Sequence, residues 1–500
     1  MRILTTISLI LLSFGLQSQT LSYTVSMDNP ASHMFHVVLE CKNITTSSID
    51  LKLPSWSPGY YQKLNYSNNI ENFDVIPEGG EVKWEKSSAN TWHINTGDSR
   101  SLKISYDVKA TRTFVATSFL DSTRGYIIPA SMFFHLSGRI KDPVQITVKP
   151  FAGWNNVATG LSEVPGKKFT FTAPDFDVLY DSPILVSNLE ELPAFTVKGI
   201  PHRFIAYKPG EFDRALLMND LKKIVQNASD MIGDIPYKQY TFIGIGPGQG
   251  GIEHLNSTTV SFNGSRLNNR GAYLKMLHFL AHEYFHHYNV KRIRPVELGP
   301  FDYENGNRTN MLWVSEGLSV YYEYLVTHRA GLSSEEELMN AFKANMLAFE
   351  TKTGKKYQTL AQASYATWSD GPFGRTNDTI VKTISYYDKG PVVGLLLDFA
   401  IRNATNNKKS LDDVMRTLYK EYYQKKQRGF TEEELKTVIE KTAGTSLNEI
   451  FDYIYTTNEL DYKKYLGYAG LTIDENFVIS KKENQTAAEK KLYESWLRGK

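Results

Sequence analysis

Alternating apolar and polar residues dominate the first part of the chain. From residue 19 to 203, short runs with a period of two are separated by turn residues, as at 35–40, 101–106 and 144–148. This period is typical of strands that bury one face. We therefore predict an antiparallel β domain over residues 19–203, arranged as a sandwich.

Beyond residue 204 the apolar positions recur every three to four residues, which indicates a mainly helical domain over 204–465. The fold class is thus α+β. Two strands interrupt the helices at 239–245 and 258–262, and we place the second at a sheet edge. Residues 466–500 form a short C-terminal segment, with a β segment over 471–479 and then a charged helix prone to fray. The expected helices are 211–232, 271–288, 309–331, 391–403, 410–424 and 431–442.

A loop at 54–61 contains two prolines, a glycine and the aromatic residues Trp56, Tyr60 and Tyr61. Such a loop can expose its aromatic rings for carbohydrate binding. A packed turn is the favoured interpretation, because proline and aromatic residues are common in the turns of β domains.

The N-terminus has the pattern of a secretory signal peptide. Arg2 precedes an apolar run over residues 3–16, which is short for a membrane span, and polar residues follow. We expect cleavage near Ser18 and no stable membrane insertion afterwards, although an uncleaved anchor is the alternative. The glycosylation sequon at Asn256 lies in a predicted active-site segment, where a glycan would obstruct the site. This favours a bacterial protein, either secreted or periplasmic.

Charge and cysteine content narrow the function further. The 500 residues include 56 basic and 54 acidic residues, and the net charge of +2 gives no reason to expect nucleic acid as a partner. Cys41 is the single cysteine, so a thiolate zinc cluster is excluded. Any zinc site must use histidine and carboxylate ligands.

The segment 277–288 contains the motif H-E-x-x-H, formed by His282, Glu283 and His286. On a helix, residues four apart lie on one face, so both imidazoles can bind one zinc ion. The alternative is a buried helix with hydrogen-bonded core histidines. His278 lies one turn earlier but no glutamate follows it, so we interpret it as a core or supporting residue. His287 is expected to point elsewhere.

A catalytic zinc site of this kind takes a third protein ligand from a second helix. We choose Glu316, because it lies among apolar residues where an unpaired carboxylate would be costly to bury. An exposed glutamate is the alternative for this residue, and Glu323 is the competing ligand. With one Zn²⁺ bound, Glu283 would act as general base on the metal-bound water.

Two other segments suggest substrate contacts. The glycine-rich run at 246–251, with Gly250 and Gly251 before Glu253, lets the backbone approach a ligand closely, although a simple hairpin loop is as good an interpretation. Tyr387 could donate its hydroxyl to the oxyanion of the reaction.

The chain resembles the glycyl aminopeptidase family of zinc aminopeptidases. The residues that carry the resemblance are 54–60, 250–254, 282–295, 312–322 and 385–390. The resemblance implies a thermolysin-like catalytic domain, with His282, His286 and Glu316 as zinc ligands and Glu283 as the base. By similarity to zinc aminopeptidases more broadly, Tyr387 matches the oxyanion tyrosine and Glu253 the glutamate that binds the substrate's free α-amine.

The chain departs from the family pattern in two ways. The spacing between His286 and Glu316 is longer than in thermolysin-like enzymes generally, though compatible with the family. Family members often carry a PDZ domain, and the roughly forty residues after Asp461 are too few for one.

We therefore expect a secreted zinc aminopeptidase that acts on peptides and favours small N-terminal residues such as Gly or Ala. The alternatives are a broader zinc metalloendopeptidase and a noncatalytic secreted protein that binds peptides or glycans. The oligomeric state does not follow from the sequence.

Overall fold

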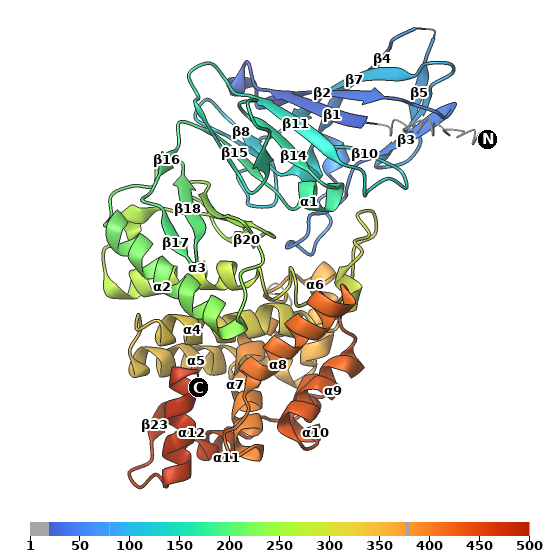
Figure 1. Ribbon diagram of the computed structural model, residues 1–500. Helices are drawn as coiled ribbons and strands as arrows, with labels where there is room; N and C mark the ends of the chain where they lie inside the picture. The colour runs from blue at the N-terminus through green and yellow to red at the C-terminus, as the bar shows by residue number, and fades with distance from the viewer. Residues whose placement is uncertain (1–19, 80, 376–380, 500) are drawn as a thin grey trace, which may run out of the picture.

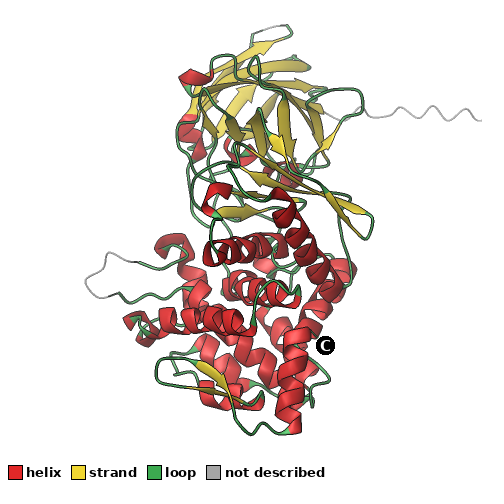
Figure 2. Ribbon diagram, turned by 90° about the vertical axis from the view of Figure 1, so that its left-hand side faces the viewer, coloured by secondary structure: helices red, strands yellow, loops and turns green. Residues whose placement is uncertain are grey.

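The computed structural model describes residues 20–79, 81–375 and 381–499. The chain folds into a β-rich N-terminal part that sits on a mainly helical part (Figures 1 and 2). This arrangement confirms the predicted α+β class. The predicted signal peptide, 1–18, lies outside the described residues. Within the described part of the chain, no helix combines the length and apolar character that a bilayer crossing requires.

The β domain is built around a seven-stranded sheet. Its strands alternate between buried and solvent-facing residues: Val37 and Leu39 of β2 are buried opposite Tyr106 and Ile104 of β7. All neighbouring pairs are antiparallel except β1 and β11, which are parallel. In spatial order the strands are β13 (Ser162–Glu163), β14 (Thr170–Ala173), β11 (Val144–Lys149), β1 (Thr20–Ser26), β2 (Met34–Lys42), β7 (Ser101–Lys109) and β4 (Ile70–Pro77).

Two four-stranded sheets complete the β domain, and their apolar faces contribute to one continuous core with the large sheet. The first contains β10 (His135–Leu136), β3 (Ser48–Lys52), β6 (Thr91–Asn95) and β5 (Lys83–Lys86). The second contains β12 (Asn156–Thr159), β15 (Ile184–Ser187), β9 (Gly125–Ile127) and β8 (Phe119–Leu120), and the short helix α1 (Phe176–Tyr180) precedes β15.

A further sheet lies between the β domain and the helices (Figure 1). Its first three strands, β16, β17 and β18, begin before the domain boundary that we predicted at residue 203. Strands β16 and β17 each pair with β18, and β18 pairs with β19. The strand order is β16 (Glu190–Glu191), β18 (Ile200–Ala206), β19 (Tyr240–Gly244), β21 (Ser257–Val260) and β20 (Gly251–Glu253), with β17 (Phe195–Val197) also on β18.

The strand that we predicted at the edge of this sheet is internal. β21 pairs with β19 on one side and with β20 on the other, so β20 forms the edge. Only three residues long and beginning with a glycine, β20 has too little hydrophobic pattern to be predicted as a strand. The glycine-rich run thus supplies the sheet edge.

The helices of the second part pack around one large core that includes α3 and α4. The expected helices are present, but the one predicted at 309–331 begins as a π-helical turn, η6 (Trp313–Gly317), and a second π-helical segment, η8 (Tyr419–Lys426), extends α8. The α-helices are α2 (Arg214–Ile232), α3 (Arg270–Phe285), α4 (Leu318–Arg329), α5 (Glu335–Glu350), α6 (Leu360–Asp370), α7 (Tyr386–Ala404), α8 (Leu411–Leu418), α9 (Glu432–Ala443), α10 (Asn448–Tyr455), α11 (Tyr462–Tyr468) and α12 (Ala487–Arg498).

The C-terminal helix is not a frayed appendage, contrary to our expectation. After the hairpin of β22 (Leu471–Ile473) and β23 (Ile479–Lys481), α12 buries Trp496 completely. The Trp496 indole nitrogen donates to the Tyr321 hydroxyl at 3.0 Å, and Arg329 donates to the Trp496 carbonyl at 3.0 Å. Five of the twelve residues of α12 are charged, and they obscure this one anchoring face in the sequence.

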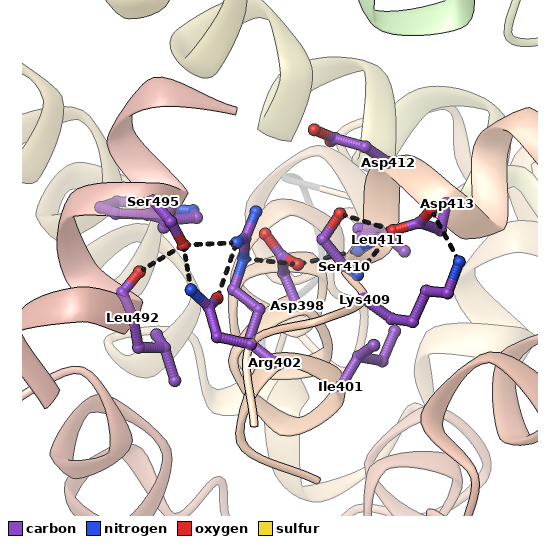
Figure 3. A network of polar contacts seen from close by, with 12 residues as sticks. Asp398, Ile401, Arg402, Lys409, Ser410, Leu411, Asp412, Asp413, Leu492 and Ser495 are labelled. Atoms are coloured by element: carbon purple, nitrogen blue, oxygen red, sulfur yellow. Dashed lines mark hydrogen bonds and ion pairs between the residues drawn. The ribbon is translucent and has the colours of Figure 1, made fainter. Parts of the chain in front are cut away.

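A buried polar network connects α7, α8 and α12 (Figure 3), and Tyr321 joins it from α4. Asp398 accepts hydrogen bonds from the Tyr321 hydroxyl at 2.7 Å and from the Leu411 backbone at 2.8 Å. Arg402 donates to Asp398 at 3.2 Å and to Ser495 at 3.0 Å. Because the contacts with Tyr321, Leu411 and Ser495 form only when the helices are docked together, the network fixes their relative positions.

The loop at 54–61 is a packed turn that joins the two parts of the molecule. Trp56 is fully buried and its indole nitrogen donates to the Asp302 carbonyl at 2.8 Å. Its ring contacts those of Phe301 and Trp368, with centroids 5.8 and 5.0 Å away. The Trp56 ring is therefore not exposed for carbohydrate binding.

We expect Trp496→Ala to lower the free energy of unfolding by about 3–5 kcal/mol, because it leaves a large cavity between α12 and α4. Urea unfolding followed by circular dichroism measures this loss. Tyr365→Ala is the control, since Tyr365 lies on α6 of the same core and is 48% exposed; its expected effect is about 0.5 kcal/mol. Equal losses in the two variants would contradict the docking role of α12.

Candidate metal centre

Two histidines of α3 and one glutamate of η6 converge on a common point. The side chain of Asn269 caps the start of α3 by accepting from the Ala272 backbone, and the helix ends at His286. Apolar residues bury its central turns, including Leu277 and Leu280. His282 therefore lies deep in the protein, one helical turn before His286.

The three side chains have the composition of a zinc site. The His282 and His286 Nε2 atoms are 2.8 Å apart, and Glu316 Oε2 lies 3.6 and 3.2 Å from them. All three side chains are buried, and their ligand atoms lie within 4.8 Å of one another. Two imidazole nitrogens and one carboxylate oxygen suit Zn²⁺ and leave a fourth position open. The residues present therefore fit the metal.

The rear nitrogen of each imidazole is held by a second group. His286 Nδ1 lies 2.8 Å from the Asn289 carbonyl, and His282 Nδ1 lies 2.9 Å from Glu323 Oε2. Such contacts orient an imidazole so that Nε2 faces the metal. Glu323, our competing ligand, therefore stands behind His282 rather than beside Glu316.

Electrostatics at the centre favour a cation. Burial alone would raise the pKa of Glu316, but the two imidazoles lower it below its usual range. Burial likewise opposes charge on His282 and His286, yet nearby carboxylates outweigh it and raise both pKa values: those of Glu316 and Glu323 at His282, and chiefly that of Glu316 at His286. The carboxylates thus attract positive charge to this point, and zinc would replace the imidazole protons.

The π-helical turn sets the position of Glu316. Asn289 donates from its amide to the carbonyls of Val314 at 2.7 Å and Ser315 at 3.1 Å, which a regular α-helix would use internally. On the opposite side, a Cβ on Gly317 would lie 2.6 Å from Gly390 Cα, so α7 approaches closely. This contact requires glycine on both helices.

Close packing of α7 brings Tyr387 to the centre. Its hydroxyl donates to Glu316 Oε2 at 2.9 Å, and its ring lies 6.1 Å from that of His282. Burial and the Glu316 charge raise the pKa of Tyr387 well above its ordinary value. The phenol therefore stays protonated and can donate a hydrogen bond.

Glu283 follows His282 and faces the edge strand. Burial raises its pKa to about 7, a value suited to proton transfer near neutral pH. A Cβ on Gly251 would lie 2.5 Å from Glu283 Oε1, so only glycine fits here, and Gly250 has a φ of 83°. The structure thus places Gly251 against the predicted base, and Gly250 lines the same cavity.

A cavity of about 690 Å³ opens onto His282, Glu283 and Tyr387. Gly250 and Gly251 line it too, and Phe373, which is 66% exposed, stacks on Tyr387 at its wall. This volume is typical of small-ligand sites and leaves room for a short peptide.

Glu253 lies at the other end of β20. It lines an adjacent cavity of about 390 Å³, and both cavities share Gly59 and Tyr61 as lining residues. The Glu253 side chain is buried, and no described residue donates a hydrogen bond to its Oε1 atom; the Lys291 ammonium is 3.6 Å away. An unsatisfied buried carboxylate oxygen is costly and marks this position for an incoming donor.

The remaining histidines of the segment are accounted for. His278 lines the larger cavity, and burial lowers its pKa to about 4, so it is neutral. His287 packs among Tyr237, Tyr240 and Tyr284, away from the centre, as we expected. Gly59, Tyr61, Lys291 and Asp181 also surround the site. The first three lie in segments that the sequence analysis singled out, but no role was predicted for them, and Asp181 lies in no such segment.

Family models match two separate parts of the chain. Residues 22–188 match the model described as Peptidase M61 N-terminal domain, and residues 275–393 match M61 glycyl aminopeptidase. Together they cover more than half of the chain. No curated protein sequence matches it.

Solved structures share the fold. One, described as an aminopeptidase N family protein from Idiomarina loihiensis, has a TM-score of 0.86 at 24% identity and covers 94% of this chain and 82% of its own. An M1 zinc metallopeptidase from Deinococcus radiodurans has a TM-score of 0.54 at 14% identity, covering 88% and 94%. A mutant of that M1 zinc metallopeptidase bound to a Tyr-Ser-Ala substrate has a TM-score of 0.55 at 14% identity. The match covers 88% of this chain and 94% of the mutant's chain.

Glu323→Gln should weaken zinc binding about 10- to 100-fold, because it removes the carboxylate behind His282. Titration against a competing chelator measures the affinity. The matched control is Glu337→Gln, which alters a glutamate that lines the same cavity but pairs with Arg270 at 2.7 Å. Unchanged zinc affinity in the Glu323 variant, or an equal loss in both, would contradict the assigned contact.

Proposed function

The chain belongs to the M61 glycyl aminopeptidase family, and from this premise we propose that it is a zinc-dependent aminopeptidase that removes small N-terminal residues such as Gly or Ala from peptides. The observation that carries the proposal is the arrangement around β20. The base Glu283 faces the start of this strand, and the unsatisfied carboxylate of Glu253 lies at its end.

Glu253 supports exopeptidase action through charge. An N-terminal ammonium can donate to the unsatisfied Oε1 atom of Glu253, whereas an acetylated N-terminus offers no positive charge there. A peptide extended along the free edge of β20 would pair with its backbone and place its first residues between Glu253 and the metal centre. Binding of the free amine would then position the first peptide bond for cleavage.

The chemical steps fall to Glu283 and Tyr387. Zinc held by His282, His286 and Glu316 would supply Lewis-acid activation of water and of the scissile carbonyl. Glu283 takes the proton from the attacking water and returns it to the leaving amine. Tyr387 shifts its hydroxyl donation from Glu316 toward the oxyanion that forms at the carbonyl.

A broader metalloendopeptidase is the second candidate, and one observation favours it. Glu253 lines the smaller cavity, whereas Glu283 and Tyr387 line the larger one. A peptide that crosses both cavities would extend on either side of the cleaved bond. The noncatalytic alternative draws no support from the site, because the ligand, base and hydroxyl groups are present together.

We also propose export from the cell, on the signal-peptide pattern at 1–18. The enzyme would then meet peptides in the periplasm or outside the cell.

Purified protein of measured zinc content should cleave Gly- and Ala-terminated peptides and leave their N-acetylated forms intact. Glu283→Gln should lower kcat by about a hundredfold or more while zinc content is unchanged, because the variant cannot accept the proton. Equal cleavage of the acetylated peptides would favour the endopeptidase. Bound zinc with no cleavage of either kind would favour the binding protein.

Tyr387→Phe should lower kcat about 10²- to 10³-fold with little change in KM, since the hydroxyl acts on charge that develops only in the transition state. Steady-state kinetics on a Gly-terminated peptide give both constants. Tyr386→Phe is the control, because the neighbouring hydroxyl contacts Thr367 at 3.0 Å instead of Glu316. A larger effect on KM than on kcat would assign Tyr387 to substrate binding.

A further inference from the structure

A carboxylate of the β domain reaches the proposed amine site. Asp181 caps the end of α1 and is largely buried. Its Oδ2 accepts a hydrogen bond at 2.7 Å from the backbone of Leu255, two residues after Glu253. Its Oδ1 lies 2.8 Å from Lys291 Nζ and 3.3 Å from His254 Nδ1. One side chain therefore holds both the chain that follows Glu253 and the lysine beside it.

Lys291 stands between two carboxylates. Its ammonium is 2.8 Å from Asp181 but 3.6 Å from Glu253 Oε1, and its side chain is 8% exposed. Burial alone would lower the pKa of Lys291, yet Asp181 and Glu253 outweigh it and raise the value. Two buried carboxylates thus share one lysine, and Glu253 Oε1 still accepts no hydrogen bond from the described residues.

The loop of the packed turn closes the other side of Glu253. A Cβ on Gly59 would lie 2.7 Å from Ile252 Cγ2 and 3.0 and 3.1 Å from the two Glu253 carboxylate oxygens. Gly59 also has a φ of 93°, which favours glycine. The backbone of the β domain therefore packs directly on the Glu253 carboxylate and restricts its movement.

We propose that Asp181 and Lys291 are positioning residues for recognition of the substrate's α-ammonium, so that the β domain completes the amine site. Asp181 holds Lys291 away from Glu253, and Lys291 lies between the two carboxylates. Glu253 Oε1 is thereby left without a hydrogen bond from the described residues, and the substrate amine can supply one. This inference deepens the proposed aminopeptidase function and rests on it.

Loss of either residue has a definite consequence. Without the Asp181 charge, Lys291 is free to pair with Glu253 and competes with the substrate amine. Without Lys291, two nearby buried carboxylates repel each other, and one of them takes up a proton or moves. Both changes weaken ammonium binding without touching the metal ligands.

The test compares two inhibitors that bind zinc through the same group. Glycine hydroxamate carries an α-amine, and acetohydroxamate lacks it. In the wild type, the first should bind more tightly than the second. Asp181→Asn and Lys291→Met should each weaken the binding of glycine hydroxamate about tenfold or more. They should change the binding of acetohydroxamate less than about twofold. KM for Gly-terminated peptides should rise more than kcat falls, at unchanged zinc content.

Two further variants control for structural damage. Lys291→Arg keeps the cation and should recover most of the preference for the amine. Lys141→Met alters a lysine that lines the smaller cavity together with Glu253 and Lys291, but it pairs with Asp175 and Asp177 at 3.1 and 2.5 Å. The preference for the amine-bearing inhibitor should therefore be unchanged in this variant.

The failures of the two proposals are distinguishable. If the wild type prefers the amine-bearing inhibitor and both Asp181→Asn and Lys291→Met retain that preference, the positioning role is overturned and the aminopeptidase stands. Equal weakening of both inhibitors, or loss of zinc, would likewise overturn the positioning role, because the residues would then support the site as a whole. A wild type with no preference for the amine would overturn the proposed function itself.

Discussion

Compensation of buried charge at the end of α3 is the interaction on which the rest of the helical domain depends. His282 and His286 lie in the core. The Glu316 carboxylate contacts the Nε2 atom of both rings, and the Glu323 carboxylate contacts the opposite nitrogen of His282. A buried carboxylate is tolerated only where a cation or donors balance it. The elements that carry these groups, α3, η6 and α4, must therefore dock accurately before any chemistry is available.

Polar contacts behind the metal centre maintain that accuracy. Asn289 occupies the carbonyls of the π-helical turn, and the Gly317–Gly390 contact lets α7 approach it. On the far side of α4, Tyr321 links Asp398 to Trp496, so even the C-terminal helix supports the helix that carries Glu323. A catalytic site needs its groups placed to within about 0.5 Å, and such supporting contacts provide it.

The two domains meet at the substrate side of this centre rather than at a remote hinge. The packed turn around Trp56 joins them, and the next residues of that turn reach Glu253. In the proposed enzyme, the helical domain supplies the metal ligands, the base and the oxyanion donor. The β domain supplies groups that orient the amine site, which gives a physical reason for both domains to be present in one chain.

The sequence by itself determined those features that depend on local periodicity. The alternating strands of the β domain and the pairing of His282 with His286 on one helical face follow from residue spacing alone. Other features depended on the tertiary structure. Residue spacing allowed both Glu316 and Glu323 as ligands, and only the docking of α4 on α3 assigned them to opposite sides of His282. The internal place of β21 and the contact of Asp181 with Lys291, 110 residues away, likewise arise from packing between distant segments, which no local pattern encodes.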